Sequence, residues 1–122
     1  MLSFKEFLSE AKESTTEWMP INKLSDHIHG SAVKAMAKHD FYKTLLNHDM
    51  AHGGSGELFH RVKTNKHGMV AVQAASNKKD KEGHTHHATF HVSTSGRRII
   101  HGEWEKTKDG TTRTVRRFGY ED

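Results

Sequence analysis

The chain has no cysteine and only one proline among its 122 residues. The absence of cysteine excludes disulfide bonds, thiolate zinc sites, iron–sulfur clusters and a cysteine nucleophile. No stretch approaches the roughly 18 apolar residues of a membrane span, and Lys5, Glu6 and Glu10 interrupt the N-terminus where a secretory signal needs an apolar region. We therefore expect a cytoplasmic protein without a membrane partner.

Apolar residues are also scarce. Hydrophobic residues make up 33% of the chain, and the mean hydropathy is −0.84. Six Phe, two Trp and two Tyr in periodic segments nevertheless indicate a folded domain with a thin core. The net charge of +4 is unevenly distributed, because Glu57–Phe118 carries thirteen Lys and Arg against six acidic residues. Such a basic segment attracts polyanions, so nucleic acid or an acidic host protein is the expected partner.

The first half of the chain has the spacing of amphipathic helices. In Met1–Lys12 the apolar residues fall on one helical stripe, which predicts a short helix followed by a linker that ends at residue 16. Between residues 21 and 50, apolar residues recur about every four positions and predict one or two helices, with Ser25 and Asp40 as N-caps. The glycines of Ala51–Gly56 end this region and indicate a hinge.

The second half, residues 57–118, consists of short β-branched and aromatic segments separated by turn signals. It predicts five strands: Leu58–Lys63, Met69–Ala75, His86–Thr94, Arg98–Lys106 and Thr111–Phe118. Because short connections join antiparallel neighbours, we expect a five-stranded antiparallel meander covered on one face by helix. The predicted fold class is α+β, with residues 1–16 preceding a single small domain over residues 17–122.

The N-terminal segment carries a further signal. Its sequence, Met-Leu-Ser-Phe-Lys-Glu-Phe-Leu-Ser-Glu-Ala-Lys, resembles the opening of many proteins of contractile-tailed bacteriophages (myoviruses), where Met-x-x-Phe/Tyr-x-x-Phe-Leu/Ile-x-Glu-Ala recurs. In internal head proteins of that group, such a segment directs the protein to the capsid and is cut by the prohead protease after Leu/Ile-x-Glu. The resemblance implies processing at Leu8, Ser9 and Glu10, before Ala11. It also implies contact with the head scaffold or protease, assembly in the host cytoplasm and packaging in the virion head.

Twelve histidines make imidazole the main candidate ligand for any metal in this chain. His84 and His86 stand about 7 Å apart on an extended chain and could share an ion. His48 and His52 have the one-turn spacing of a ligand pair on a helix. Neither pair has an evident third ligand, so we expect structural roles, no bound metal and no cofactor.

A second candidate site consists of basic residues that could contact phosphates. Its members are Arg97, Arg98, Arg113, Arg116, Arg117, Lys78, Lys79 and Lys81. The alternative is exposed charge that protects sheet edges from aggregation. From such a surface we expect little sequence specificity.

A third candidate is an acid–base group on one strand. Alternation places His101, Glu103 and Glu105 on one face, where His101 could act as a base. Adjacent carboxylates on a strand are usually only a solvated face, and the chain has no nucleophile elbow, P-loop or dinucleotide motif.

We therefore predict a non-enzymatic phage accessory protein, carried in or on the virion, that binds packaged nucleic acid or inhibits a host defence component. The alternatives are a small histidine- or metal-dependent nuclease and a structural head or tail component. A nuclease should have a cleft in which histidines meet acids, whereas a binding module should show a continuous basic face.

Overall fold

The computed structural model describes residues 13–119 of the chain. Strands hold 42% of these residues and helices 25%, so the protein is mostly β. The predicted α+β class was therefore wrong, because the helices between residues 21 and 51 are short whereas two of the strands reach ten residues. The predicted helix of Met1–Lys12 and the processing residues Leu8, Glu10 and Ala11 lie outside the described residues.

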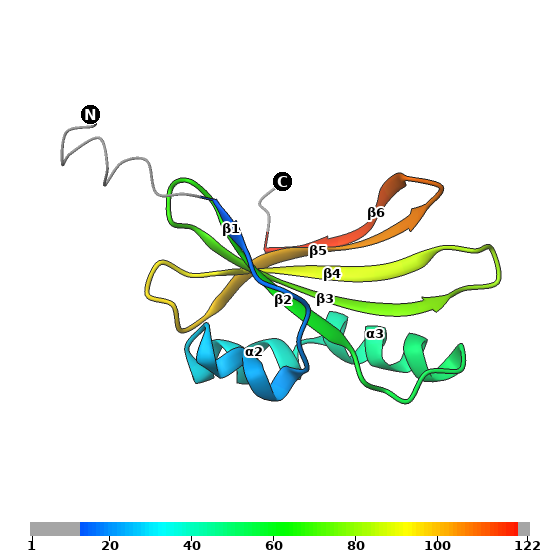
Figure 1. Ribbon diagram of the computed structural model, residues 1–122, viewed down its shortest axis with the longest axis horizontal. Helices are drawn as coiled ribbons and strands as arrows, with labels where there is room; N and C mark the ends of the chain where they lie inside the picture. Colours follow the sequence, from blue (N-terminus) through cyan, green and yellow to red (C-terminus); the bar gives the residue numbers. More distant parts are fainter. Residues whose placement is uncertain (1–12, 120–122) are drawn as a thin grey trace.

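Within residues 13–119, six strands form one antiparallel sheet whose spatial order follows the chain (Figure 1). They are β1 (Ser14–Thr15), β2 (Phe59–Thr64), β3 (Val70–Lys79), β4 (Thr85–Val92), β5 (Ile99–Lys108) and β6 (Thr111–Phe118). Asp109 and Gly110 join β5 to β6 with φ angles of 52° and 77°, the left-handed pair that a type I′ hairpin turn requires. Ser14 and Thr15, which the sequence assigned to a linker, form a strand because they pair with the free edge of β2.

Three short helices in the described part of the chain lie on one side of the sheet (Figure 1). They are the 3₁₀-helix η1 (Ile21–Asp26) and the α-helices α2 (Gly30–Lys38) and α3 (Asp40–Ala51). No helix within residues 13–119 is long and apolar enough to cross a membrane. None of these three helices covers the opposite side of the sheet.

Histidine side chains begin both α-helices. Nδ1 of His29 and Nδ1 of His39 each accept a hydrogen bond, of 3.0 and 3.1 Å, from the backbone N–H two residues later. The predicted N-caps were wrong, since Ser25 lies inside η1 and Asp40 is the first residue of α3. A neutral imidazole can replace the usual Ser or Asp oxygen because one of its nitrogens is an acceptor.

The core lies between the helices and the sheet. Its largest fully buried side chains are Phe90, Leu24, Met36, Leu45, His60 and Val72. His60 donates from Nδ1 to the Met19 carbonyl (3.1 Å) and accepts at Nε2 from the Tyr42 hydroxyl (2.7 Å). Burial lowers the pKa of His60, against the opposing effect of the Met19 carbonyl, and burial raises the pKa of Tyr42 to about 12. The pair is therefore neutral.

The glycine-rich segment after α3 closes onto a buried carboxylate. Asp49, only 2% exposed, accepts hydrogen bonds from the Ser76 hydroxyl (2.6 Å) and the Gly56 N–H (3.0 Å). A Cβ atom at Gly54 would overlap the Asp49 carboxylate, so this position accommodates only glycine without rearrangement. The hinge expected from the sequence is a tethered loop.

Candidate functional site

The side of the sheet that η1, α2 and α3 do not cover, called the open face below, carries three rows of side chains that run across the strands. Alternation along each strand directs Phe90 and its core neighbours toward the helices and the residues between them toward the open face. The first row is Lys63, Ala71, His91 and His101; the second is Arg61, Gln73, Thr89, Glu103 and Arg117; the third is Phe59, Ala75, His87, Glu105 and Thr114.

The second row is a hydrogen-bonded ridge. Nε of Arg61 donates to Oε1 of Gln73 at 2.7 Å, and Nε2 of Gln73 donates to Oγ1 of Thr89 at 3.5 Å. Thr89 is only 7% exposed although it lies on the open face, because its neighbours surround it. The ridge therefore holds Arg61 in a defined orientation.

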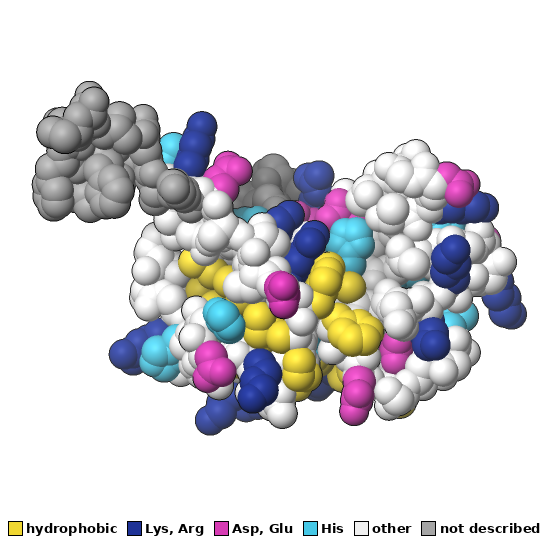
Figure 2. All heavy atoms as spheres, in the orientation of Figure 1, with side chains coloured by type: hydrophobic (Ala, Val, Ile, Leu, Met, Phe, Trp, Pro, Cys, Tyr) yellow, Lys and Arg dark blue, Asp and Glu magenta, His cyan; other side chains and the backbone are white. Residues whose placement is uncertain are grey.

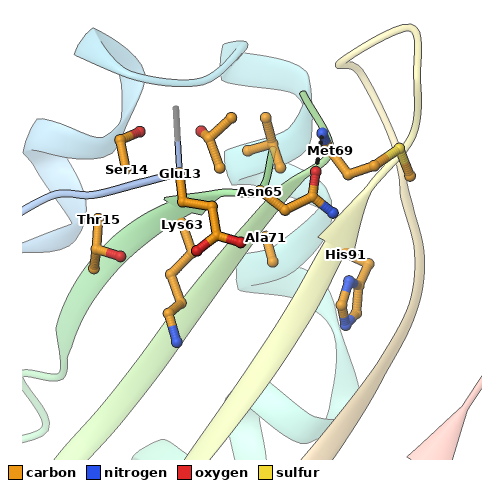
Figure 3. Close-up of a pocket in the computed structure, with 10 residues that line it drawn as sticks. Glu13, Ser14, Thr15, Lys63, Asn65, Met69, Ala71 and His91 are labelled. Carbon is orange, nitrogen blue, oxygen red and sulfur yellow. Dashed lines mark hydrogen bonds between the residues drawn. The ribbon is translucent and has the colours of Figure 1, made fainter. Parts of the chain in front are cut away.

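Two hollows flank this ridge, because β3 has alanines at both neighbouring positions of the open face. The Ala71 hollow has a volume of about 310 Å³, and Glu13, Lys63 and His91 stand around its floor (Figure 3). The Ala75 hollow, of about 240 Å³, is lined by Trp18, Arg61, Gln73, Ala75, Ser76, Thr85, His86, His87 and Thr107. It adjoins a further hollow of about 400 Å³ over Trp18, Phe59, Ala75, Ser76 and Asn77.

Aromatic side chains are exposed at the Ala75 hollow. Trp18 is 45% exposed and Phe59 44% exposed. The guanidinium carbon of Arg61 lies 4.5 Å from the centroid of the Trp18 ring, within the range of a cation–π contact. One end of the open face thus combines two exposed aromatic rings with an oriented cation.

The segment Glu13–Met19 forms the rim of both hollows and is hydrogen-bonded to the edge of β2. The Thr16 N–H donates to the Val62 carbonyl (3.0 Å), and the Thr16 hydroxyl oxygen accepts from the Val62 N–H (2.9 Å). The backbones of Met19 and His60 exchange two hydrogen bonds of 2.7 and 2.8 Å. These bonds fix Glu13 and Trp18 at opposite ends of the rim.

The acid–base candidates His101, Glu103 and Glu105 lie on the open face, where each meets a histidine of β4. The rings of His91 and His101 stack with centroids 4.2 Å apart, and Nε2 of His91 is 3.6 Å from Oε1 of Glu103. Nε2 of His87 is 3.4 Å from Oε1 of Glu105. Burial and the neighbouring His91 lower the pKa of His101, against the opposing charge of Glu103.

Burial also lowers the pKa of His87, although the nearby Glu105 carboxylate acts in the opposite direction. His87 and Glu105 thus form one imidazole–carboxylate pair, beside the Ala75 hollow, and His91 and Glu103 form a second pair, beside the Ala71 hollow. The open face holds imidazoles and carboxylates together in two places, one beside each hollow.

The four metal candidates gather on the helix side of the sheet. The His48 ring lies 4.3 Å from the His52 ring and 4.0 Å from the His86 ring, measured between centroids. His86 accepts at Nδ1 from the Trp104 indole N–H (3.1 Å) and donates from Nε2 to Oδ2 of Asp80 (2.8 Å), so neither of its nitrogens has a lone pair left for a metal.

His84 is the remaining metal candidate, and its Nδ1 lies 3.6 Å from Oδ1 of Asp80. The hydrogen bond from His86, together with backbone N–H groups of His84 and Glu82, holds the pKa of Asp80 well below its usual range. Burial and the neighbouring His86 lower the pKa of His48. Over residues 13–119, no group of three or more acidic or histidine side chains has an arrangement that could hold a metal ion.

The basic candidates are dispersed. Arg97 and Arg98 lie in the turn after β4, whereas Lys78, Lys79 and Lys81 lie at or near the β3–β4 connection, at the opposite end of β4. Figure 2 shows Lys and Arg side chains scattered over one side of the molecule among hydrophobic and acidic ones.

The arginines of β6 are divided between the two faces of the sheet. Arg116 is paired in register with Trp104, and its guanidinium carbon lies 5.3 Å from the centroid of the Phe41 ring on the helix side. Arg113 is paired with Lys106, which lies on the same side as Trp104, whereas Arg117 lies opposite Glu103 on the open face. The described residues thus bring the acid–base candidates together and separate the basic ones.

Sequence reasoning missed Glu13, Trp18, Arg61 and Lys63. A signal existed for Arg61 and Lys63, because they alternate with the buried residues of β2 and so share the open face with Phe59. Glu13 and Trp18 reach this face only because their segment docks on the edge of β2, which no local pattern predicts.

Comparison with known proteins gives no relative: no family model, no curated protein and no solved structure matches the chain.

Proposed function

We propose that the protein binds single-stranded nucleic acid across the open face of its sheet. The observation that carries the proposal is the exposed Trp18 ring, stacked against the Arg61 guanidinium and next to the exposed Phe59. Nucleobases stack on such rings, and one stacked base contributes about 1–3 kcal/mol to binding. Arg61 and Lys63 on β2 would contact the phosphates beside the stacked bases.

The shape of the site favours a single strand over a duplex. Bases within a duplex stack on one another, so they cannot lie flat on Trp18 and Phe59. A duplex-tracking surface would need contiguous cations, and the arginines of β6 are divided between the two faces. The bases of a single strand, in contrast, are free to enter the hollows.

The charge of the site predicts how binding depends on salt. Arg61, Lys63 and Arg117 share the open face with Glu103 and Glu105, so its net charge is small. If Arg61 and Lys63 neutralise two phosphates, the logarithm of the association constant should fall with the logarithm of the salt concentration at a slope of about −1.4. Most of the affinity would come from stacking.

The proposal can be tested by fluorescence anisotropy with a labelled single-stranded oligonucleotide. Replacing Trp18 by Ala should weaken binding about tenfold or more, and Trp18→Phe should restore part of it because a ring remains. Arg61→Gln should weaken binding further than Arg97→Gln, a matched loss of charge at the end of β4 away from the Ala75 hollow. Equal binding by Trp18→Ala and the parent protein would refute the proposal.

We further propose that this activity belongs to a phage accessory protein carried in the virion. Support comes from the N-terminal resemblance to myovirus head proteins, which concerns residues that the structure does not describe. Single-stranded nucleic acid would then be met after injection into the host.

A further inference from the structure

The Ala71 hollow combines three kinds of chemical group that the proposed binding of nucleic acid does not by itself require. Figure 3 shows the Glu13 carboxylate reaching over Ala71, with the Lys63 ammonium on one side and the His91 imidazole on the other. A site that only bound phosphate would exclude a carboxylate, because it repels the ligand. A carboxylate, an imidazole and a cation around one small cavity are the components of acid–base catalysis at a phosphodiester.

We infer that the Ala71 hollow cleaves RNA by transfer of the phosphodiester to the neighbouring 2′-hydroxyl. In this step the 2′-oxygen bonds to phosphorus while Glu13 takes its proton, and the bond from phosphorus to the 5′-oxygen breaks while His91 protonates that oxygen. The products are a 2′,3′-cyclic phosphate and a 5′-hydroxyl. The proton that Glu13 gains balances the one that His91 loses, and no co-reactant is consumed.

The spacing of the strands suits this reaction. Lys63 and His91 are the register neighbours of Ala71 on its two sides, so their Cα atoms stand about 10 Å apart across two strand spacings. The alanine between them leaves the room that a phosphate and ribose need. Lys63, which lines the hollow, would supply the cation that stabilises the additional negative charge on the phosphorane.

His91 is held for this role by two neighbours. Its Nε2 is shielded from solvent and stands 3.6 Å from Oε1 of Glu103, so the proton given to the 5′-oxygen would leave from Nδ1, the other ring nitrogen. Its ring stacks on His101, whose pKa burial and His91 lower, so that His101 stays neutral beneath it. Glu103 and His101 are positioning residues, because they act through His91.

The inference rests on the proposed function, in which a single strand of nucleic acid lies on the open face. The stacking site at Phe59 and Ala75 and the hollow at Lys63 and Ala71 are four residues apart along β2 and β3, or about 13 Å. A short oligonucleotide stacked on Trp18 can span this distance. The stacking site would then select the strand, and the Ala71 hollow would act on it.

The test uses the full chain and an end-labelled oligodeoxynucleotide that contains one ribonucleotide. Cleavage should occur only after the ribonucleotide, and mass spectrometry should show a 2′,3′-cyclic phosphate. His91→Gln and Glu13→Gln should each lower the rate at least about 100-fold. His27→Gln, which changes an exposed histidine of the helical layer, should cleave like the parent protein, whereas a contaminating ribonuclease would cleave equally in all four preparations.

Binding is measured separately with the all-deoxy strand, which has no 2′-hydroxyl and cannot be cut. If the parent protein binds this strand but leaves the ribonucleotide intact, or if His91→Gln cleaves as fast as the parent, the catalytic inference is wrong and the proposed function stands. If the parent binds neither strand, both fail. Glu103→Gln should lower kcat with little change in KM, which a defect of binding would not reproduce, and its circular dichroism spectrum should match that of the parent, which excludes a defect of folding.

Discussion

Acid should destabilise this protein in a pH range where most carboxylates remain ionised. The reason is the state of its histidines: burial lowers the pKa of His60, His39, His48, His87 and His101 in the folded protein. Of these, His60 is the most deeply buried, at 1% exposed, and the Met19 carbonyl and the Tyr42 hydroxyl satisfy both nitrogens of its neutral ring.

The sign follows from proton linkage. Below the ordinary histidine pKa of about 6.5, the unfolded chain takes up protons at these residues before the folded protein does. The free energy of unfolding therefore falls as the pH drops below that value, by up to about 1.4 kcal/mol per pH unit for each histidine that stays neutral in the fold. His60 should contribute close to this slope, and the four half-buried histidines less.

Between pH 6.5 and 5, His60 alone should remove about 2 kcal/mol from a total stability of about 5–15 kcal/mol, and the other four histidines should add to this loss. Asp80, whose pKa is lowered by its hydrogen bond with His86, adds nothing to this loss because its contribution disappears only in stronger acid. The measurement is urea denaturation, followed by circular dichroism between pH 7.5 and 5.

A double variant isolates the contribution of His60. His60→Leu with Tyr42→Phe replaces both hydrogen-bonding partners by apolar groups, which should cost little at pH 7.5 and make the pH slope shallower by about one proton. Tyr42→Phe alone leaves Nε2 of His60 unpaired and should destabilise the fold by about 1–3 kcal/mol. A stability that is flat between pH 7.5 and 5, or an unchanged slope in the double variant, would refute this reasoning.

Three further predictions concern metal, the tethered loop and processing. Equilibrium dialysis should find no one-to-one zinc site tighter than about micromolar, because Trp104 and Asp80 occupy both nitrogens of His86; tight binding abolished by His48→Ala would contradict this. Gly54→Ala should lower stability by about 1–3 kcal/mol in thermal melts, because its Cβ would overlap the Asp49 carboxylate, whereas Gly30→Ala, with open space at Cβ, should not. Mass spectrometry of virions should find the chain beginning at Ala11, with 112 of the 122 residues left, and intact Met1 in mature heads would rule out processing.

The sequence predicted which face of its strand each side chain occupies, but not which side chains of adjacent strands come into contact. Alternation alone placed His101, Glu103 and Glu105 on one side of a strand, because side chains of an extended chain must alternate. It could not place His91 against Glu103, since that contact depends on the register between β4 and β5. Register is a property of the whole sheet, and no single strand encodes it.

A bulge determines which face of the sheet each arginine of β6 occupies. Simple alternation on β6 would put Arg113 and Arg117 on one face and Arg116 on the other. The register shift opposite Trp104 and Glu105 inserts Val115, so Arg113 and Arg116 share the helix side and Arg117 faces the open side. The three arginines are divided between the faces in either case, and the bulge decides that Arg113 is grouped with Arg116 instead of Arg117.

The fold class was misjudged for a different reason, which also bears on function. Helical periodicity between residues 21 and 50 was real, but it is divided among η1, α2 and α3, and these together cover only one side of a long sheet. A two-layer protein of this kind normally keeps the other side polar and filled. Here Ala71 and Ala75 interrupt that side between larger neighbours, and an aromatic ring stands 45% exposed at its rim. Neither the alanines nor the exposed ring is needed for solubility, because polar side chains in their place would make the protein more soluble. The hollows of the open face are therefore where a ligand should be sought.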